Sequence, residues 1–232
     1  MIGTALRRTG SGFDPLASIS WYEAHWAGDP LWSNPGDGSL VSSWRDGSGN
    51  ARDASSSGGS RPTYRATGGP NSQPAVDFGT SGTYMTGPSS TLSQTFSMVA
   101  VANFGVVDGT NRYILAAPGA GVLLGYYNPG AGKVWRFHAG SSLATAAADT
   151  SSHLFVAVFN NASSKGYVDA SSWSGTAGSN SLSQLELSGF GPGFNTCNGK
   201  IAFAATYSGD VTANSQWAAF KSWVLSTYGI SA

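Results

Sequence analysis

Apolar and polar residues alternate with a period of two along much of the chain, which is the pattern of β-strands half-buried in a sheet. The clearest run is Thr95 to Phe104, whose apolar face would carry Phe96, Met98, Ala100, Ala102 and Phe104. Turns rich in Gly and Pro separate the runs, as at 34–38 and at Pro118-Gly119. Further strands are predicted at 19–26, 41–45, 112–116, 121–127, 134–139, 153–160, 165–169, 182–187 and 200–207. Many short strands between such turns predict a sandwich or barrel.

The pattern changes near the end of the chain, where apolar residues recur at helical spacing. A helix is predicted over 212–228, with Thr212 able to cap its start and Gly229 placed to end it. We expect the helix to dock on the sandwich, and binding of a separate partner is the alternative. The apolar stripe that supports docking consists of Trp217, Phe220, Val224 and Tyr228.

The chain divides into an irregular arm at 1–17 and one β-domain over 18–232, which includes the helix. The arm carries the pair Arg7-Arg8, which either anchors a partner or is simply solvated. No apolar stretch follows this basic pair, so the start does not read as a secretory signal. No run reaches the ~20 apolar residues that span a bilayer, so no membrane association is expected.

Charge is sparse, since Asp, Glu, Lys and Arg make up 10% of the residues and the net charge is zero. A nucleic-acid-binding protein would normally present a basic face, so no nucleic-acid partner is expected. Apolar residues make up 41% of the chain, which is enough for a core. The surface should therefore be rich in uncharged polar residues, as in extracellular and virion proteins.

Several motifs occur in a recognisable order. Trp44-Arg45-Asp46 leads into a Ser-Gly-Asn turn at 48–50, and Arg-Pro-Thr-Tyr at 61–64 precedes Pro-Ala-Val-Asp-Phe at 74–78. This order resembles laminin-G-like jelly-roll domains of the concanavalin A-like lectin/glucanase superfamily, in their bacterial and phage subtype. The C-terminal strand and helix resemble the same family. The resemblance implies an all-β, antiparallel two-sheet jelly-roll sandwich with one short C-terminal helix.

Catalytic motifs of that superfamily are not found in the sequence. Its retaining glucanases carry Glu-x-Asp-x-x-Glu, whereas the only glutamates here, Glu23 and Glu186, lie outside such a pattern. A glycosidase needs two carboxyls flanking the bond, roughly 5–10 Å apart. The three histidines and the single cysteine, Cys197, match no nucleophile motif. The chain is therefore not expected to be an enzyme, and a glycoside hydrolase with an atypical site is kept as an alternative.

No cofactor is predicted, although calcium stays open because many relatives of this fold bind it through loop oxygens. Asp46 and Asn50 could supply such oxygens, and calcium takes six to eight of them. The strand at 201–207 lacks the acidic residue that many relatives carry after Ile201. Turn capping is therefore the preferred role of Asp46 and Asn50.

Carbohydrate recognition uses aromatic rings beside amide and carboxylate groups. Aromatic residues next to turns are the candidates here, and packing on the edges of the sandwich is the alternative for each. The predicted carbohydrate-binding residues are Trp32, Tyr126, Tyr127, Asn128 and Trp173.

By fold analogy, the preferred interpretation is a non-catalytic phage virion surface module, either a capsid decoration protein or a minor tail protein. Its arm would bind other virion proteins, and the domain, on the virion surface or elsewhere outside the cell, would contact host-surface polysaccharide. Many copies would strengthen such contacts, with homo-oligomers left open. The alternatives are a free carbohydrate-binding module or lectin, the glycoside hydrolase, and a structural protein without a ligand.

Overall fold

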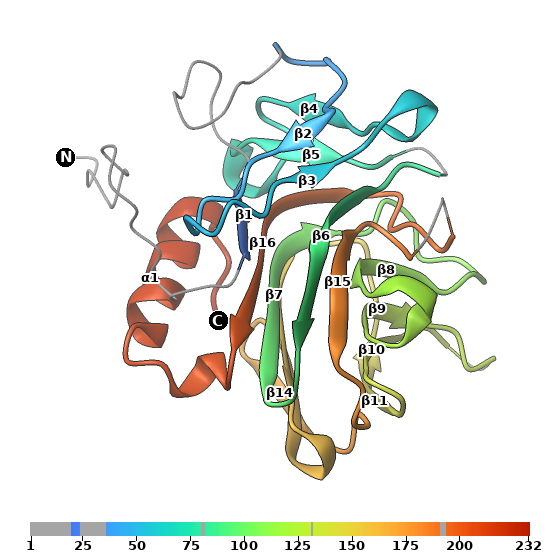
Figure 1. Ribbon diagram of the computed structural model, residues 1–232, viewed down its shortest axis with the longest axis vertical. Helices are drawn as coiled ribbons and strands as arrows, with labels where there is room; N and C mark the ends of the chain where they lie inside the picture. Colours follow the sequence, from blue (N-terminus) through green and yellow to red (C-terminus); the bar gives the residue numbers. More distant parts are fainter. Residues whose placement is uncertain (1–19, 24–35, 80–81, 131, 191–193) are drawn as a thin grey trace.

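The protein is a two-layer β-sandwich in the part of the chain that the computed structural model describes, residues 20–23, 36–79, 82–130, 132–190 and 194–232. Two antiparallel sheets of eight strands each are stacked face to face in these residues, and one α-helix lies near the C-terminus (Figure 1). This confirms the predicted all-β, two-sheet sandwich with a short C-terminal helix. No helix in the described ranges has the length and hydropathy of a membrane span.

The first sheet contains the long central strands β7 and β16. Its order is β14, β13, β12, β7, β16, β5 and β4, with β1 paired alongside β16. The bounds are β1 Ser20–Glu23, β4 Thr63–Arg65, β5 Ala75–Asp77, β7 Phe96–Asn103, β12 His153–Phe159, β13 Ser164–Val168, β14 Ser171–Gly175 and β16 Lys200–Ser208.

The second sheet has the order β11, β10, β9, β8, β15, β6, β3 and β2. Strands β8 to β11 follow one another as a meander, and β15, which comes later in the sequence, lies between β8 and β6. The bounds are β2 Ser43–Trp44, β3 Ala54–Ser55, β6 Met85–Leu92, β8 Arg112–Ala116, β9 Leu123–Tyr127, β10 Val134–His138, β11 Ser142–Ala147 and β15 Leu182–Leu187.

Strand β7 shows how the sequence builds both layers. Its even-numbered apolar residues, from Phe96 to Ala102, face the second sheet and join the main core together with Phe104. Val99 and Val101 face the other way and join a second cluster beneath the helix. Because both faces of β7 are buried, its residues are apolar except for Ser97 and Asn103, and the predicted alternation separates the two clusters.

Helix α1, Trp217–Tyr228, covers the outer face of the first sheet. Phe220, Val224 and Tyr228 are buried against that sheet, and the Phe220 ring lies 5.5 Å from the ring of Phe203 on β16. In Figure 1 the helix lies beyond β16, on the side of the molecule away from β8 to β11. The predicted docking of the apolar stripe is therefore confirmed.

The predicted start of the helix is wrong by five residues. Residues Val211–Ala213 form a separate 3₁₀ turn, in which Asp210 accepts a hydrogen bond from the backbone N–H of Thr212. Asn214 then caps the backbone N–H of Gln216, and α1 begins at Trp217. The predicted end is confirmed, since Gly229 adopts the left-handed conformation (φ 70°) that glycine accommodates without a Cβ clash.

Candidate functional site

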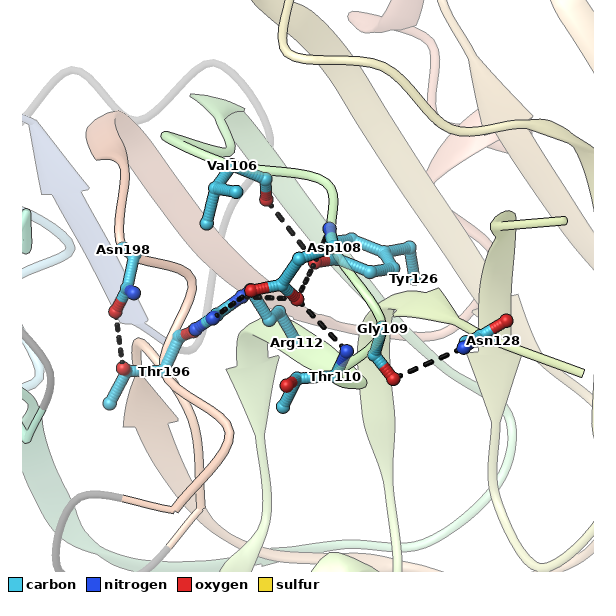
Figure 2. A network of polar contacts seen from close by, with 9 residues as sticks. All are labelled: Val106, Asp108, Gly109, Thr110, Arg112, Tyr126, Asn128, Thr196 and Asn198. Atoms are coloured by element: carbon cyan, nitrogen blue, oxygen red, sulfur yellow. Dashed lines mark hydrogen bonds and ion pairs between the residues drawn. The ribbon is translucent and has the colours of Figure 1, made fainter. Parts of the chain in front are cut away.

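The loop between β7 and β8 carries a compact polar network around Asp108 and Arg112 (Figure 2). The guanidinium of Arg112 donates to Asp108 Oδ2 at 2.6 Å and to the carbonyl oxygen of Thr196 at 3.1 Å. The hydroxyl of Tyr126 lies 3.2 Å from Asp108 Oδ1 and donates to the carbonyl oxygen of Val106. These groups satisfy one another, so the network joins the β7–β8 loop to the segment that precedes β16.

The charge of Arg112 sets the protonation of this network. Its hydrogen bond to the carboxylate lowers the pKa of Asp108 to about 2, against a smaller opposing effect of burial. A carboxylate whose pKa is lowered by folding stabilises the fold above its unfolded value, near 4, and loses that contribution as the pH falls towards 2. The network is thus an acid-sensitive structural contact.

We expect Asp108→Asn to flatten the acid limb of the stability profile. The wild-type free energy of unfolding should fall more steeply than that of the variant between pH 5 and pH 2, because only wild type must protonate Asp108. Asp108 is 36% exposed, so solvent screening should keep the difference within about 1 kcal/mol. Urea unfolding at pH 7, 4 and 2.5 measures it, and parallel profiles for the two proteins would contradict the assignment.

A second cluster lies on the outer face of the second sheet, where β8, β9 and β10 run side by side. Tyr126 and Trp135 point into the core, and alternation therefore places their neighbours Tyr127 and Arg136 on the opposite face. The ring of Tyr127 lies 5.0 Å from the guanidinium carbon of Arg136. We call this cluster the tyrosine–arginine platform, formed by Tyr113, Tyr127, Arg136, His138 and Ser142.

Arg136 is the centre of the platform. Its guanidinium donates to the Tyr113 hydroxyl at 3.1 Å, to Ser142 Oγ at 2.9 Å and to His138 Nδ1 at 3.1 Å. Burial, followed by the positive charge of Arg136, lowers the pKa of His138, so its ring is neutral at pH 7. Burial also raises the pKa of the Tyr113 hydroxyl, which stays protonated.

Two phenylalanines extend the platform at one edge. The ring of Phe190 lies 5.9 Å from that of Tyr113, and the ring of Phe194 stacks at 6.3 Å from Phe190. Phe194 is 62% exposed, the largest value among the exposed large apolar side chains that the structure describes. An exposed ring continuous with buried rings and hydrogen-bonding groups has the chemistry of a ligand surface.

The residues predicted from the sequence to bind carbohydrate do not lie together in the structure. Tyr126 is fully buried, with its ring 4.8 Å from Phe104, so it belongs to the core and its prediction as a sugar platform is corrected. Tyr127 is half-buried on the outer face. The Asn128 side chain accepts a hydrogen bond from the backbone N–H of Gly130 in its own turn and donates one to the carbonyl oxygen of Gly109 in the β7–β8 loop.

Other predicted residues lie elsewhere. Trp173 on β14 is half-buried and packs against the main core, so binding of sugar there stays a prediction. Trp32, Arg7 and Arg8 lie outside the described residues.

The predicted calcium ligands lie in a turn after β2. Asp46 accepts hydrogen bonds from the backbone N–H and hydroxyl of Ser48 and from the backbone N–H of Arg52. The side-chain amide and backbone N–H of Asn50 both lie within hydrogen-bond range of Ser48 Oγ. These contacts match the preferred turn-capping role, and calcium binding stays a prediction. Across the described part of the chain, no three His, Cys, Asp or Glu side chains are grouped as metal ligands would be.

A histidine between two carboxylates lies at the end of the sandwich. His153 contacts Asp169 Oδ2 through Nδ1 at 2.6 Å and Asp149 Oδ1 through Nε2 at 3.0 Å. Burial lowers the pKa of His153, but the hydrogen bonds to both carboxylates outweigh it and the net shift is upward. Asp169 also accepts a hydrogen bond from the backbone N–H of Leu154, so this cluster fixes the start of β12.

No protein-family model and no curated protein sequence matches this chain. Solved structures do share its fold. Trypanosoma rangeli sialidase aligns with 90% of this chain at 16% identity and a TM-score of 0.58, over 33% of the sialidase chain. A GH54 α-L-arabinofuranosidase aligns with 82% at 15% identity and a TM-score of 0.59, over 52% of its own chain.

A third similar structure consists of one domain of an arabinanase. Domain 4 of AbnA, a GH43 extracellular arabinanase from Geobacillus stearothermophilus, was solved in complex with arabinotriose. It aligns with 75% of this chain at 14% identity and a TM-score of 0.50, over 94% of that domain. This chain thus spans about a third of the sialidase but nearly the whole of the arabinanase domain.

These comparisons correct two expectations. The chain was expected to be a non-catalytic phage virion module, and it was expected not to be an enzyme. Both expectations rested on fold analogy and on the missing Glu-x-Asp-x-x-Glu strand. The structures that share its fold are instead glycoside hydrolases, which favours the alternative kept from the sequence. At 14–16% identity the likeness shows the fold alone.

Most of the platform was not predicted from the sequence. Arg136, His138, Phe190 and Phe194 were not among the residues expected to bind a ligand. A signal was present in Val134 to His138, where Arg136 and His138 alternate with Trp135 and Phe137. Polar residues at every second position of a strand face away from the core, which would have placed Arg136 and His138 together.

Proposed function

We propose that this chain is a carbohydrate-binding β-sandwich domain of a glycoside hydrolase and that it holds polysaccharide on the tyrosine–arginine platform. The observation that carries the proposal is the unbroken row from exposed Phe194 through Phe190 and Tyr113 to Arg136 and Tyr127. The exposed ring of Phe194 and the half-buried ring of Tyr127 can contact the apolar faces of sugars, and the polar groups between them can bind sugar hydroxyls. Tyr113 is only 2% exposed, so its ring connects the row without offering a face to the ligand. The arabinanase domain solved with arabinotriose supports a sugar ligand for this fold.

The test is binding of the purified chain to a panel of polysaccharides that includes arabinan, followed by substitution of Phe194. We expect Phe194→Ala to weaken binding about tenfold, which corresponds to about 1.4 kcal/mol. Leu225→Ala is the matched control, because Leu225 is also a large exposed apolar residue, 52% exposed, but lies on α1 on the other layer. Equal weakening by both variants, or no binding to any polysaccharide, would overturn the proposal.

Hydrolysis by the chain itself is a second candidate, favoured by the position of Glu186. This glutamate lies on β15 in register with Ala116, whose side chain belongs to the cluster around Tyr113 on the outer face. Glu186 is 4% exposed, so its carboxyl group is buried within the face of the sheet that carries the platform. The usual mechanism requires a second carboxyl roughly 5–10 Å away, and the register neighbours Ala116 and Thr86 do not supply it.

Release of reducing ends from the bound polysaccharide tests this second candidate. If the chain is catalytic through Glu186, wild type should release them and Glu186→Gln should lose at least a hundredfold in rate, because general acid–base catalysis contributes about 10²–10⁴-fold. Binding of the same polysaccharide by Glu186→Gln is the control for folding. A wild type that binds but releases nothing excludes hydrolysis of that polysaccharide and leaves the binding proposal standing.

A further inference from the structure

Arg136 differs from three other paired cations of the described residues in the charge of its partners. Arg112 meets Asp108 at 2.6 Å, Lys165 meets Asp210 at 2.8 Å and Arg65 meets Asp77 at 3.1 Å. The hydrogen-bond partners of Arg136 are instead a phenol, an alcohol and a neutral imidazole. Among the residues that the structure places, no carboxylate is within ion-pair distance of Arg136.

The partners of Arg136 hold its guanidinium in one orientation. Ser142, Tyr113 and His138 each take one N–H, from Nε, Nη1 and Nη2 respectively, and the Tyr127 ring lies against the guanidinium. An arginine side chain carries five N–H donors, so one donor remains on each terminal nitrogen. Two donors on adjacent nitrogens match the two oxygens of a carboxylate, which binds arginine in a bidentate manner.

The tautomer of His138 follows from its contact with Arg136. Arginine has no acceptor, so its contact with His138 requires Nδ1 to accept, and the proton of the neutral ring then lies on Nε2. The platform therefore presents a positive charge and several N–H and O–H groups, while its described members carry no negative charge. A half-buried cation with only neutral partners is completed electrostatically by an anionic ligand.

We propose that the tyrosine–arginine platform selects acidic polysaccharide, with the carboxylate of a uronic-acid-type sugar bound by Arg136. This inference rests on the proposed carbohydrate-binding function and names the class of ligand for the same site. Arg136 supplies the charge, the aromatic row supplies contact area for the sugar rings, and His138 and Ser142 orient the guanidinium. Neutral sugars would lack the group that Arg136 is arranged to meet.

The experiment compares two forms of the same sugar chain. Binding of wild type to oligogalacturonate and to alginate is measured beside their methyl esters, which keep the sugar and remove the charge. We expect at least tenfold tighter binding of the free acids, which weakens as sodium chloride is raised from 50 to 500 mM. Arg136→Gln should lose this preference and bind acid and ester alike.

Arg45→Gln is the matched control, since it also removes one arginine charge but lies just after β2, at the opposite edge of the sheet from β11. It should keep the preference for the acids. Arg136→Lys keeps the charge without the planar pair of donors, so it should show an intermediate preference for the acids. It replaces Arg136→Gln as the test variant if Arg136→Gln does not fold. Equal binding of acid and ester by wild type, binding of neutral polysaccharides alone, or a preference retained by both Arg136 variants overturns the inference. Absence of binding to any polysaccharide overturns the proposed function itself.

Discussion

Trp44→Ala should lower the free energy of unfolding by about 3–5 kcal/mol, the range for removal of a large aromatic side chain from a core. Trp44 is fully buried on β2, which is an edge strand of the second sheet, and it belongs to the main core cluster. Domains of this kind have total stabilities of about 5–15 kcal/mol, so the loss is a large fraction. Urea unfolding followed by tryptophan fluorescence and by circular dichroism measures the change.

Leu40→Ala is the control for this substitution. Leu40 lies four residues earlier on the same segment, but it is 49% exposed, so its truncation should change the free energy of unfolding by less than about 1 kcal/mol. A Trp44→Ala variant within 0.5 kcal/mol of wild type would show that β2 does not contribute to the core. A similar large loss in both variants would indicate that the segment, rather than the indole, is responsible.

The strands with clear alternation could be predicted from the sequence because burial of one face dictates their pattern. The hairpin of β8 and β9 is an example, since Pro118 and Gly119 interrupt two apolar runs at the point where the chain turns. Strands β6 and β11 were not predicted, because their polar residues face solvent and leave little periodic signal. Their pairing is decided by neighbours distant in sequence, as β6 pairs with β15.

The platform could be predicted only in part, for a related reason. Tyr127 was among the predicted sugar residues because it precedes a turn, but Tyr126 beside it was chosen on the same grounds and is buried. Alternation alone states that the two rings point to opposite faces, and it does not state which face is the core. The meeting of Arg136 with Tyr113 depends on the register between β8, β9 and β10, which becomes visible only in the folded sheet.

Gly105→Ala should destabilise the fold by about 1–3 kcal/mol or more, because overpacking against rigid neighbours is costly. A Cβ at Gly105 would overlap the carbonyl oxygen of Asn198 and lie 2.9 Å from its carbonyl carbon. Both obstacles are backbone atoms, so no side chain can rotate away to relieve the clash. The Asn198 side chain also accepts a hydrogen bond from the hydroxyl of Thr196, and the carbonyl oxygen of Thr196 accepts one from Arg112. Displacement of the Asn198 backbone should therefore disturb the network in Figure 2. Urea unfolding measures the loss.

Two further glycine substitutions test the close contact between the segments 103–105 and 198–199, one within the contact and one at a glycine with free space around it. Gly199→Ala would place a Cβ on the carbonyl oxygen of Asn103 and should destabilise the fold to a similar degree. Gly59→Ala is the control, because no atom lies within 4 Å of a Cβ there, and its effect should stay within about 0.5 kcal/mol. If Gly105→Ala and Gly199→Ala were as stable as Gly59→Ala, the segments 103–105 and 198–199 could not cross as closely as the structure shows. The loop that carries Asp108 would then need a different anchor.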